Sequence, residues 1–361
     1  MLEFPPDPEA LRGVVLTQRP VLGLDLGGTQ IRAAIVLPDG QRLARIADDT
    51  RSHDGPDAVV ARCLRALEAA RDAAPREVAD ALVGIGISSP GPVDPFAGVV
   101  VDPPNLGPDF HDVPLAARVE QALGLPTFLG RDTVVAALAE WAYGAAAGCD
   151  DFLYVTVSTG IGGAVVSDGR LLSGPDGTAG ELGHVTVDMD GPACGCGGAG
   201  HLEAVSSGRA IARDARAAAA RGESPFLAAR AAALPEGVEG LGARDVAAGE
   251  EAADAASIAI MARVRRAFAA AAVAWVDLFD PARVIIGGSI AESQGDRLLG
   301  PAREAIARDA FRAPARRVTL VHPELGADVS LAGAHPLVSR RLQEDATRSV
   351  RTALVPESVP A

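Results

Sequence analysis

The hydrophobic pattern of the chain contains two stretches that begin in the same way. In residues 21–47, the apolar run VLGLDL ends in glycines, the run IRAAIVLP follows, and Asp39-Gly40 precedes a third run. Short apolar runs separated by Gly and Asp-Gly are typical of strands joined by tight turns. Residues 151–174 repeat this order. The pattern predicts two units, each opening with a strand, a glycine turn, a strand, a second turn and a third strand.

Apolar residues at helical spacing follow each opening and alternate with short apolar runs that predict further strands. The expected helices are 56–75, 112–124, 133–147, 208–234, 243–278, 291–309 and 331–344. The expected further strands are 81–88, 127–132, 283–289 and 316–323. Alternating strands and helices predict an α/β fold of two duplicated domains, with the ligand in an interdomain cleft.

The lobe boundaries follow from this repeat. We expect an N-terminal α/β lobe over 19–136, completed by the C-terminal helix 331–344, and a C-terminal α/β lobe over 137–330. The end stretches 1–18 and 345–361 contain proline and lack a regular apolar period, so we expect them to be loose.

Charge and hydropathy exclude several classes of protein. The formal net charge of −14 argues against a nucleic-acid binder, because such a protein presents a basic face to phosphates. No apolar run reaches the roughly 18 residues of a membrane span. Residues 1–18 lack the basic start and apolar core of a secretory signal. We therefore expect a cytoplasmic protein that binds neither nucleic acid nor membrane.

The first glycine turn carries candidate phosphate-binding chemistry. Without side chains at Gly27 and Gly28, a phosphate can approach the backbone N–H groups, and Thr29 adds a hydroxyl donor. Asp25 can hold a hydrated Mg²⁺ that bridges a nucleotide. The alternative is a tight hairpin without a ligand. The P-loop sequence of other nucleotide-binding proteins occurs nowhere in the chain.

A second turn of the same character opens the second unit, with Thr159, Gly160 and Gly162. Two such turns are hard to explain as plain hairpins. Together with Gly287-Gly288 after a late strand, they resemble segments of the actin-like ATPase superfamily, which includes hexokinases. The resemblance implies an actin-like, ribonuclease H-like fold, ATP with Mg²⁺ gripped by both turns, and adenosine near the late glycine pair.

Four nitrogen or sulfur ligands lie within 18 residues: His184, Cys194, Cys196 and His201. They suffice for a closed tetrahedral Zn²⁺ site, and a closed site leaves no position for a reacting water, so the metal is expected to be structural. The alternative is a metal-free loop with two reduced thiols.

The same segment resembles the signature of the ROK family of bacterial sugar kinases and repressors. The family pattern is Glu-x-Gly-His followed by Cys-x-Cys-Gly-x-x-Gly-Cys-x-Glu, and here it runs from Glu181 to Glu203 with His201 in place of the third Cys. The resemblance extends over about residues 20–340. It implies that Glu181, His184 and Glu203 contact sugar hydroxyls.

The catalytic base implied by the resemblance is Asp132, where a strand ends and a helix begins. Family kinases carry Asn-Asp there, and this chain has Arg131 in place of the Asn. We expect Arg131 to turn away from the sugar, toward a surface carboxylate. The alternative for Asp132 is a helix cap. Asn105 matches the Pro-Asn-Leu segment that contacts the sugar in the family, and an ordinary turn residue is the alternative.

The resemblance implies ATP-dependent phosphorylation of a hexose, with glucose as the default. Mannose, fructose, N-acetylglucosamine and N-acetylmannosamine are alternative substrates in this family. A ROK-type repressor would need a DNA-binding domain before the first strand, and only about 20 residues precede Val21. A sugar-binding protein without catalysis is the third possibility. The family also implies a homodimer or homotetramer.

Overall fold

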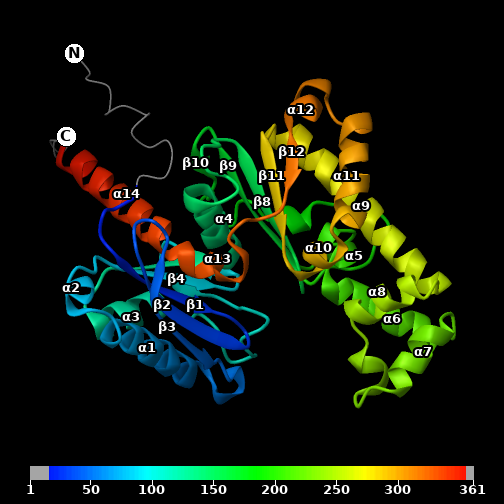
Figure 1. Ribbon diagram of the computed structural model, residues 1–361, viewed down its shortest axis with the longest axis horizontal. Helices are drawn as coiled ribbons and strands as arrows, with labels where there is room; N and C mark the ends of the chain where they lie inside the picture. Colours follow the sequence, from blue (N-terminus) through cyan, green and yellow to red (C-terminus); the bar gives the residue numbers. More distant parts are fainter. Residues whose placement is uncertain (1–15, 355–361) are drawn as a thin grey trace, which may run out of the picture. The chain divides into compact units, whose positions relative to one another are not determined.

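The computed structural model describes residues 16–354, with side chains up to residue 345 (Figure 1). The chain divides into two compact units. Unit 1 comprises Met1–Gly148, Ser173–Thr178 and Glu324–Ala361. Unit 2 comprises Cys149–Leu172 and Ala179–Pro323.

These limits differ from the expected division at 136/137 and 330/331. Helix α4 (Asp132–Tyr143) is continuous, and residues 324–330 already belong to unit 1. Parts of the two ends expected to be loose, 1–15 and 355–361, lie outside the described residues.

Unit 1 is built on a five-stranded sheet in the order β3-β2-β1-β4-β7. The strands are β1 (Val21–Leu26), β2 (Gln30–Val36), β3 (Arg42–Asp49), β4 (Ile85–Ser89) and β7 (Thr127–Arg131). The first three are antiparallel neighbours, whereas β1, β4 and β7 are parallel. Its helices and short elements are η2 (Ser52–Asp54), α1 (Pro56–Asp72), α2 (Arg76–Ala79), β5 (Val93–Asp94), β6 (Val99–Val100), α3 (Leu115–Leu123), α4, η5 (Gly326–Asp328), α13 (Val329–Ala332) and α14 (Ala334–Leu354).

Unit 2 repeats this topology in the order β10-β9-β8-β11-β12. The strands are β8 (Phe152–Val157), β9 (Ile161–Ser167), β10 (Arg170–Leu171), β11 (Arg283–Gly287) and β12 (Thr319–Val321). Strand β8 is antiparallel to β9 and parallel to β11. The helices are η3 (Leu182–His184), α5 (Leu202–Ser206), α6 (Gly208–Ala220), α7 (Pro225–Ala232), η4 (Gly237–Gly240), α8 (Ala243–Glu251), α9 (Ala255–Phe279), α10 (Ser289–Gln294), α11 (Asp296–Asp309) and α12 (Arg312–Arg317).

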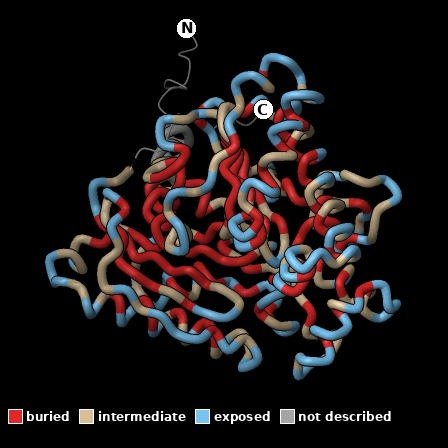
Figure 2. Tube along the Cα trace, turned by 45° about the vertical axis from the view of Figure 1, so that its right-hand side comes forward, coloured by how far each residue is buried: buried red, intermediate tan, exposed pale blue. Residues whose placement is uncertain are grey.

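The shared strand order confirms the predicted α/β duplication. Strands β1 and β4 are buried along their whole length and are apolar except for Asp25 and the two serines that end β4, as expected of strands covered on both faces. Figure 2 shows the buried stretches in the interior and the exposed ones in the outer loops and helices. Helices α1 and α3 share one apolar core with one face of this sheet. On the other face, Gly23 and Gly86 let Ala334 approach the sheet closely. Within residues 16–354, no helix is both long and apolar enough to cross a bilayer.

Several expected helices and strands have different limits. The run 208–234 forms α6 and α7, because Ser224 accepts the N–H of Leu227 and starts a new helix. The run 243–278 divides at Asp254, which caps α9 through the N–H of Ser257. Strand β12 is shorter than expected because its predecessor is helix α12. Helix α14 continues to Leu354, so the expected loose tail starts too early.

Glu140 on α4 is fully buried and binds backbone far away in the sequence. Its carboxylate accepts the N–H of Ala145 at 2.7 Å and the N–H groups of Glu324 and Leu325 at 3.0–3.2 Å. A buried charge is tolerated only with such donors around it. Glu140 therefore holds residues 324 and 325 against the end of α4.

His335 on α14 is buried, and its two hydrogen bonds fit the neutral form of the imidazole. Nε2 lies 3.1 Å from the carbonyl oxygen of Arg19, which can only accept, so Nε2 carries the proton. Nδ1 lies 3.2 Å from the Tyr143 hydroxyl and accepts from it. Burial lowers the pKa of His335, although the Arg19 carbonyl and the charge of Asp39 act in the opposite direction.

This depressed pKa predicts an acid-dependent loss of stability. The unfolded chain binds a proton at His335 below about pH 6.5, whereas the folded chain resists it, so stability is complete above that pH and falls below it. We expect the unfolding temperature of the wild type to drop between pH 7 and pH 5 by more than that of His335→Gln. The variant is less stable at pH 8. The control is His53→Gln at an exposed site, and an equal acid response in all three proteins contradicts the assignment.

Candidate functional site

The predicted residues of unit 1 gather at one edge of its sheet. In the parallel register, Asp25 lies beside Ser88, and Ser89 lies beside Arg131. These residues end β1, β4 and β7, and Asp132 follows directly as the first residue of α4. Ligands of open α/β sheets bind at the carboxyl ends of the strands. The sheet thus brings the predicted magnesium-binding acid and the predicted base to one edge.

The first glycine turn lies against the segment that contains Asn105. The turn is closed by a 2.9 Å bond from the Gly27 N–H to the carbonyl oxygen of Gln30. A β-carbon on Gly28 would come within 2.8 Å of the Asn105 carbonyl oxygen. Only glycine fits there, so the predicted phosphate turn and the predicted sugar contact are neighbours.

Asp25 has a charged partner that the sequence did not reveal. Arg32 donates from Nη2 and Nε to Oδ2 of Asp25 at 2.5 and 3.0 Å. The two residues face each other across the β1–β2 hairpin. Knowledge of the hairpin register was the missing signal, because residues directly opposite on antiparallel strands share a face.

Asp132 has the position expected of the base. Its Oδ1 accepts the N–H of Thr133 at 2.7 Å, which orients the carboxylate at the start of α4, where the helix dipole favours a negative charge. This bond also fits the alternative of a residue that satisfies the helix end. Position and chemistry are thus compatible with both roles.

Arg131 is buried, so the expected orientation toward the surface is wrong. Its side chain is buried, Nε donates to the Thr133 hydroxyl at 3.1 Å, and its methylenes pack over Gly91. The short path back to Thr133 keeps the side chain inside unit 1. Arginine at this position is therefore a packed residue beside Asp132.

The second glycine turn and the late glycine pair meet in unit 2. Gly162 pairs with Thr156 across the β8–β9 hairpin, and Gly287 lies beside Thr156 on its other side. After these strands, the hydroxyls of Ser158 and Ser289 lie 3.0 Å apart. Thr159 and Gly160 lie between β8 and β9 and Gly288 follows β11, so these predicted nucleotide residues share one end of the sheet.

Glu203 adjoins this second turn. One carboxylate oxygen accepts the N–H of Ile161 at 2.8 Å, and the other lies 3.3 Å from Nη2 of Arg209. A β-carbon on Gly160 would come within 2.6 Å of a carboxylate oxygen of Glu203, so a larger residue there would displace the end of that side chain. The predicted sugar contact and the predicted phosphate turn therefore touch each other.

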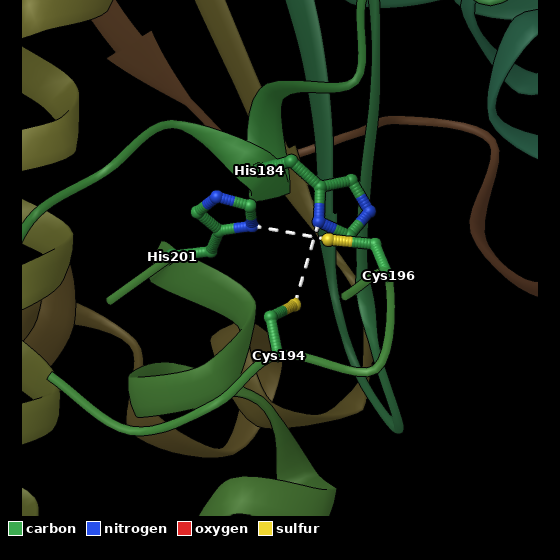
Figure 3. A group of neighbouring side chains, drawn as sticks. All are labelled: His184, Cys194, Cys196 and His201. Atoms are coloured by element: carbon green, nitrogen blue, oxygen red, sulfur yellow. Dashed lines mark hydrogen bonds between the residues drawn. The ribbon is translucent and has the colours of Figure 1, made fainter. Parts of the chain in front are cut away.

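The four predicted metal ligands form one cluster (Figure 3). Their ligand atoms all lie within 4.8 Å of one another. Cys196 Sγ is 3.2 Å from His201 Nδ1, and Cys194 Sγ is 3.6 Å from His184 Nδ1. A zinc tetrahedron with bonds of about 2.0–2.3 Å has edges of roughly 3.3–3.8 Å. Two thiols and two imidazoles at these separations fit zinc.

The surroundings of the cluster act on the Cys194 thiol in both directions. Burial raises its pKa, the backbone N–H of Cys196 lowers it, and the Cys196 side chain and the charge of Glu203 raise it. A bound cation reverses that preference because zinc binds the thiolate. The Nε2 atom of His184 lies 3.9 Å from Glu181, on the other side of the ring from Nδ1. His184 can therefore face the cluster and Glu181 at once.

Known proteins resemble this chain over most of its length. The family model described as ROK family matches residues 21–341. A glucokinase from Thermotoga maritima is 35% identical over 324 residues, which cover 89% of this chain and 98% of the relative. An N-acetylmannosamine kinase from Escherichia fergusonii is 41% identical over 202 residues, or 56% of this chain and 64% of that relative.

A solved structure matches both the sequence and the fold. The ROK family glucokinase from Streptomyces griseus in complex with glucose and AMPPNP has a TM-score of 0.69 and 30% identity, covering 88% of this chain and 98% of that one. This likeness and the repeated strand order identify the fold as that of the actin-like ATPases. Because the family match extends over most of the sequence, the chain belongs to the ROK family.

Proposed function

We propose that the protein is an ATP-dependent sugar kinase that phosphorylates glucose to glucose 6-phosphate. The observation that carries the proposal is the carboxyl end of the unit 1 sheet, where the Asp25 turn lies against Asn105 and Asp132 directly follows β7. Phosphoryl transfer needs a phosphate cradle, a magnesium ligand and a base. This edge supplies candidates for all three.

The chemical step assigns one task to each group. The sugar hydroxyl oxygen attacks the terminal phosphorus of ATP, the bond to the ADP oxygen breaks, and the hydroxyl proton passes to Asp132. The glycine turns supply backbone N–H groups to the phosphates. Asp25 would hold a hydrated Mg²⁺, which would offset the charge of the phosphates. Asn105, Glu181, His184 and Glu203 hydrogen-bond the sugar.

The similarity to an N-acetylmannosamine kinase makes N-acetylhexosamines a second candidate class of substrate. An N-acetylhexosamine differs from glucose by an amide, which needs space and a partner for the carbonyl. An assay of ADP release with glucose, mannose, fructose, N-acetylglucosamine and N-acetylmannosamine distinguishes these substrates. The highest kcat/KM on glucose supports the proposal. A higher kcat/KM on an N-acetylated sugar would make that sugar the substrate instead. If none of the sugars stimulates ADP release, the kinase proposal is contradicted.

We also propose that the cysteine–histidine cluster binds one structural zinc. Its role is to hold the loop that leads into α5, since His201 is followed directly by that helix and Glu203 lies in its first turn. With four protein ligands, the zinc would have no open coordination position and would take no part in the transfer.

The zinc proposal predicts metal content and stability. Purified protein should contain about one zinc per chain, and Cys196→Ser should lose it with a fall in unfolding temperature on the order of 5 °C. Elemental analysis and thermal unfolding measure both. Cys149→Ser, a half-buried thiol outside the cluster, is the control. Zinc-free wild type from a preparation without chelators would sink the proposal.

The base assignment predicts the kinetics of Asp132→Asn. The amide keeps the shape of the side chain but cannot take the proton, so kcat should fall by about 10²–10⁴-fold while sugar affinity persists. Steady-state kinetics and equilibrium binding of the sugar separate the two effects. Asp72→Asn, at the exposed end of α1, serves as the control. Turnover within a few-fold of wild type would remove Asp132 from the role.

A further inference from the structure

The segment 324–328, here called the return segment, leads from β12 into α13 and is held at both ends within unit 1. At its start, the carboxylate of Glu140 accepts the N–H groups of Glu324 and Leu325. At its end, the carbonyl oxygen of Ala327 accepts from Nη1 of Arg32 at 2.8 Å. The segment is thus fixed by one buried acid and by one arginine of the β1–β2 hairpin.

Asp328 gathers further arginines around the same place. Its carboxylate receives Nη2 of Arg45 at 2.5 Å, and it lies 3.5 Å from Arg42 and 3.7 Å from Arg32. Asp328 is mostly buried, with 17% of its side chain exposed. Arg32 is therefore held on one side by the return segment while its other nitrogens hold Asp25.

We propose that Arg32 is a positioning residue for the magnesium–nucleotide complex, and that the return segment sets its orientation. This inference rests on the proposed function of the Asp25 turn. Two nitrogens of the guanidinium bind the single oxygen Oδ2 of Asp25. This pairing fixes the orientation of the carboxylate, so Oδ1 would be the oxygen available to a hydrated Mg²⁺.

The planar fork of arginine is what this arrangement needs. One guanidinium donates in two directions at fixed angles, to Asp25 and to Ala327, whereas a lysine ammonium is a single point charge. All 33 cationic side chains of the chain are arginines. Exchange of Arg32 for lysine thus keeps the charge and removes the fork.

The positive charge of Arg32 should favour nucleotide binding, as the orientation of Asp25 does. Asp25 is 8% exposed, so its carboxylate is poorly solvated without a cation beside it. If Arg32 is removed, the turn gains an unbalanced negative charge where a polyphosphate should bind. The magnesium–nucleotide complex is itself negative, so its binding weakens. The sugar carries no charge, and its affinity should stay the same.

The test compares Arg32→Met and Arg32→Lys with wild type. The measurements are KM for MgATP, the free Mg²⁺ that gives half-maximal rate, KM for the sugar, and MgADP binding by calorimetry. We expect Arg32→Met to raise KM for MgATP and the dissociation constant of MgADP by about ten- to hundredfold. Arg32→Lys should lie between it and wild type, with kcat and the sugar KM changed by less than about threefold.

Two further variants test the return segment and the specificity of the effect. Asp328→Asn keeps the Arg32–Asp25 pair but loosens its support, so it should give a smaller rise in KM for MgATP than Arg32→Met. Arg118→Met breaks an arginine–aspartate pair elsewhere in unit 1 and should match wild type. A purely structural role of Arg32 would lower the unfolding temperature and change all kinetic parameters together.

The outcomes separate the two proposals. Unchanged or tighter MgADP binding by Arg32→Met overturns the positioning role, since tighter binding would mean that Arg32 competes with the cation. Wild type that binds MgADP but phosphorylates no sugar contradicts the proposed function alone, and the calorimetric comparison of variants still decides the role of Arg32. If Arg32→Met does not fold, Arg32→Lys and Asp328→Asn provide the same comparison.

Discussion

The buried carboxylate of Glu140 imposes the constraint on which unit 1 depends. A full negative charge without water requires donors on every side, and the donors here are backbone N–H groups from residues 145, 324 and 325. To supply them, the returning chain must lie against the end of α4. Helices α13 and α14 follow directly, and Ala334 then packs on the sheet opposite α1 and α3. The same placement brings Ala327 and Asp328 to Arg32, and so to Asp25.

The sequence predicted what depends on local pattern. Apolar runs with glycine or Asp-Gly punctuation located both three-stranded openings, because a hairpin is specified by its own turn residues. Sequence spacing alone grouped His184, Cys194, Cys196 and His201, because one loop can bring together ligands that lie so near one another in the sequence. The helix breaks at Ser224 and Asp254 were missed although both residues are good caps. An unbroken apolar period on both sides concealed them.

Long-range contacts could not be predicted in this way. Glu140 looks like one acid on an alanine-rich helix, and two of its three partner residues, Glu324 and Leu325, are more than 180 residues further along the chain. The position of the Arg131 side chain also depends on a contact that the sequence does not reveal. A long cation next to a predicted base suggested a side chain turned to the surface, yet its methylenes pack over Gly91 and its Nε donates to the Thr133 hydroxyl two residues away. Space left by a glycine in another loop decided its position.

The two glycine turns have the same topology but different support. In each unit, an acidic residue beside the glycine turn forms an ion pair with an arginine. The pairs are Asp25 with Arg32 and Glu203 with Arg209. Arg32 is tied to the return segment, whereas Arg209 is half exposed and lies 3.3 Å from its acid, so solvent screens that pair. Glu203 is positioned instead by the Ile161 N–H and by the helix that follows His201. The acid is thus oriented by an arginine in unit 1, and by backbone and the loop that carries the cysteine–histidine cluster in unit 2.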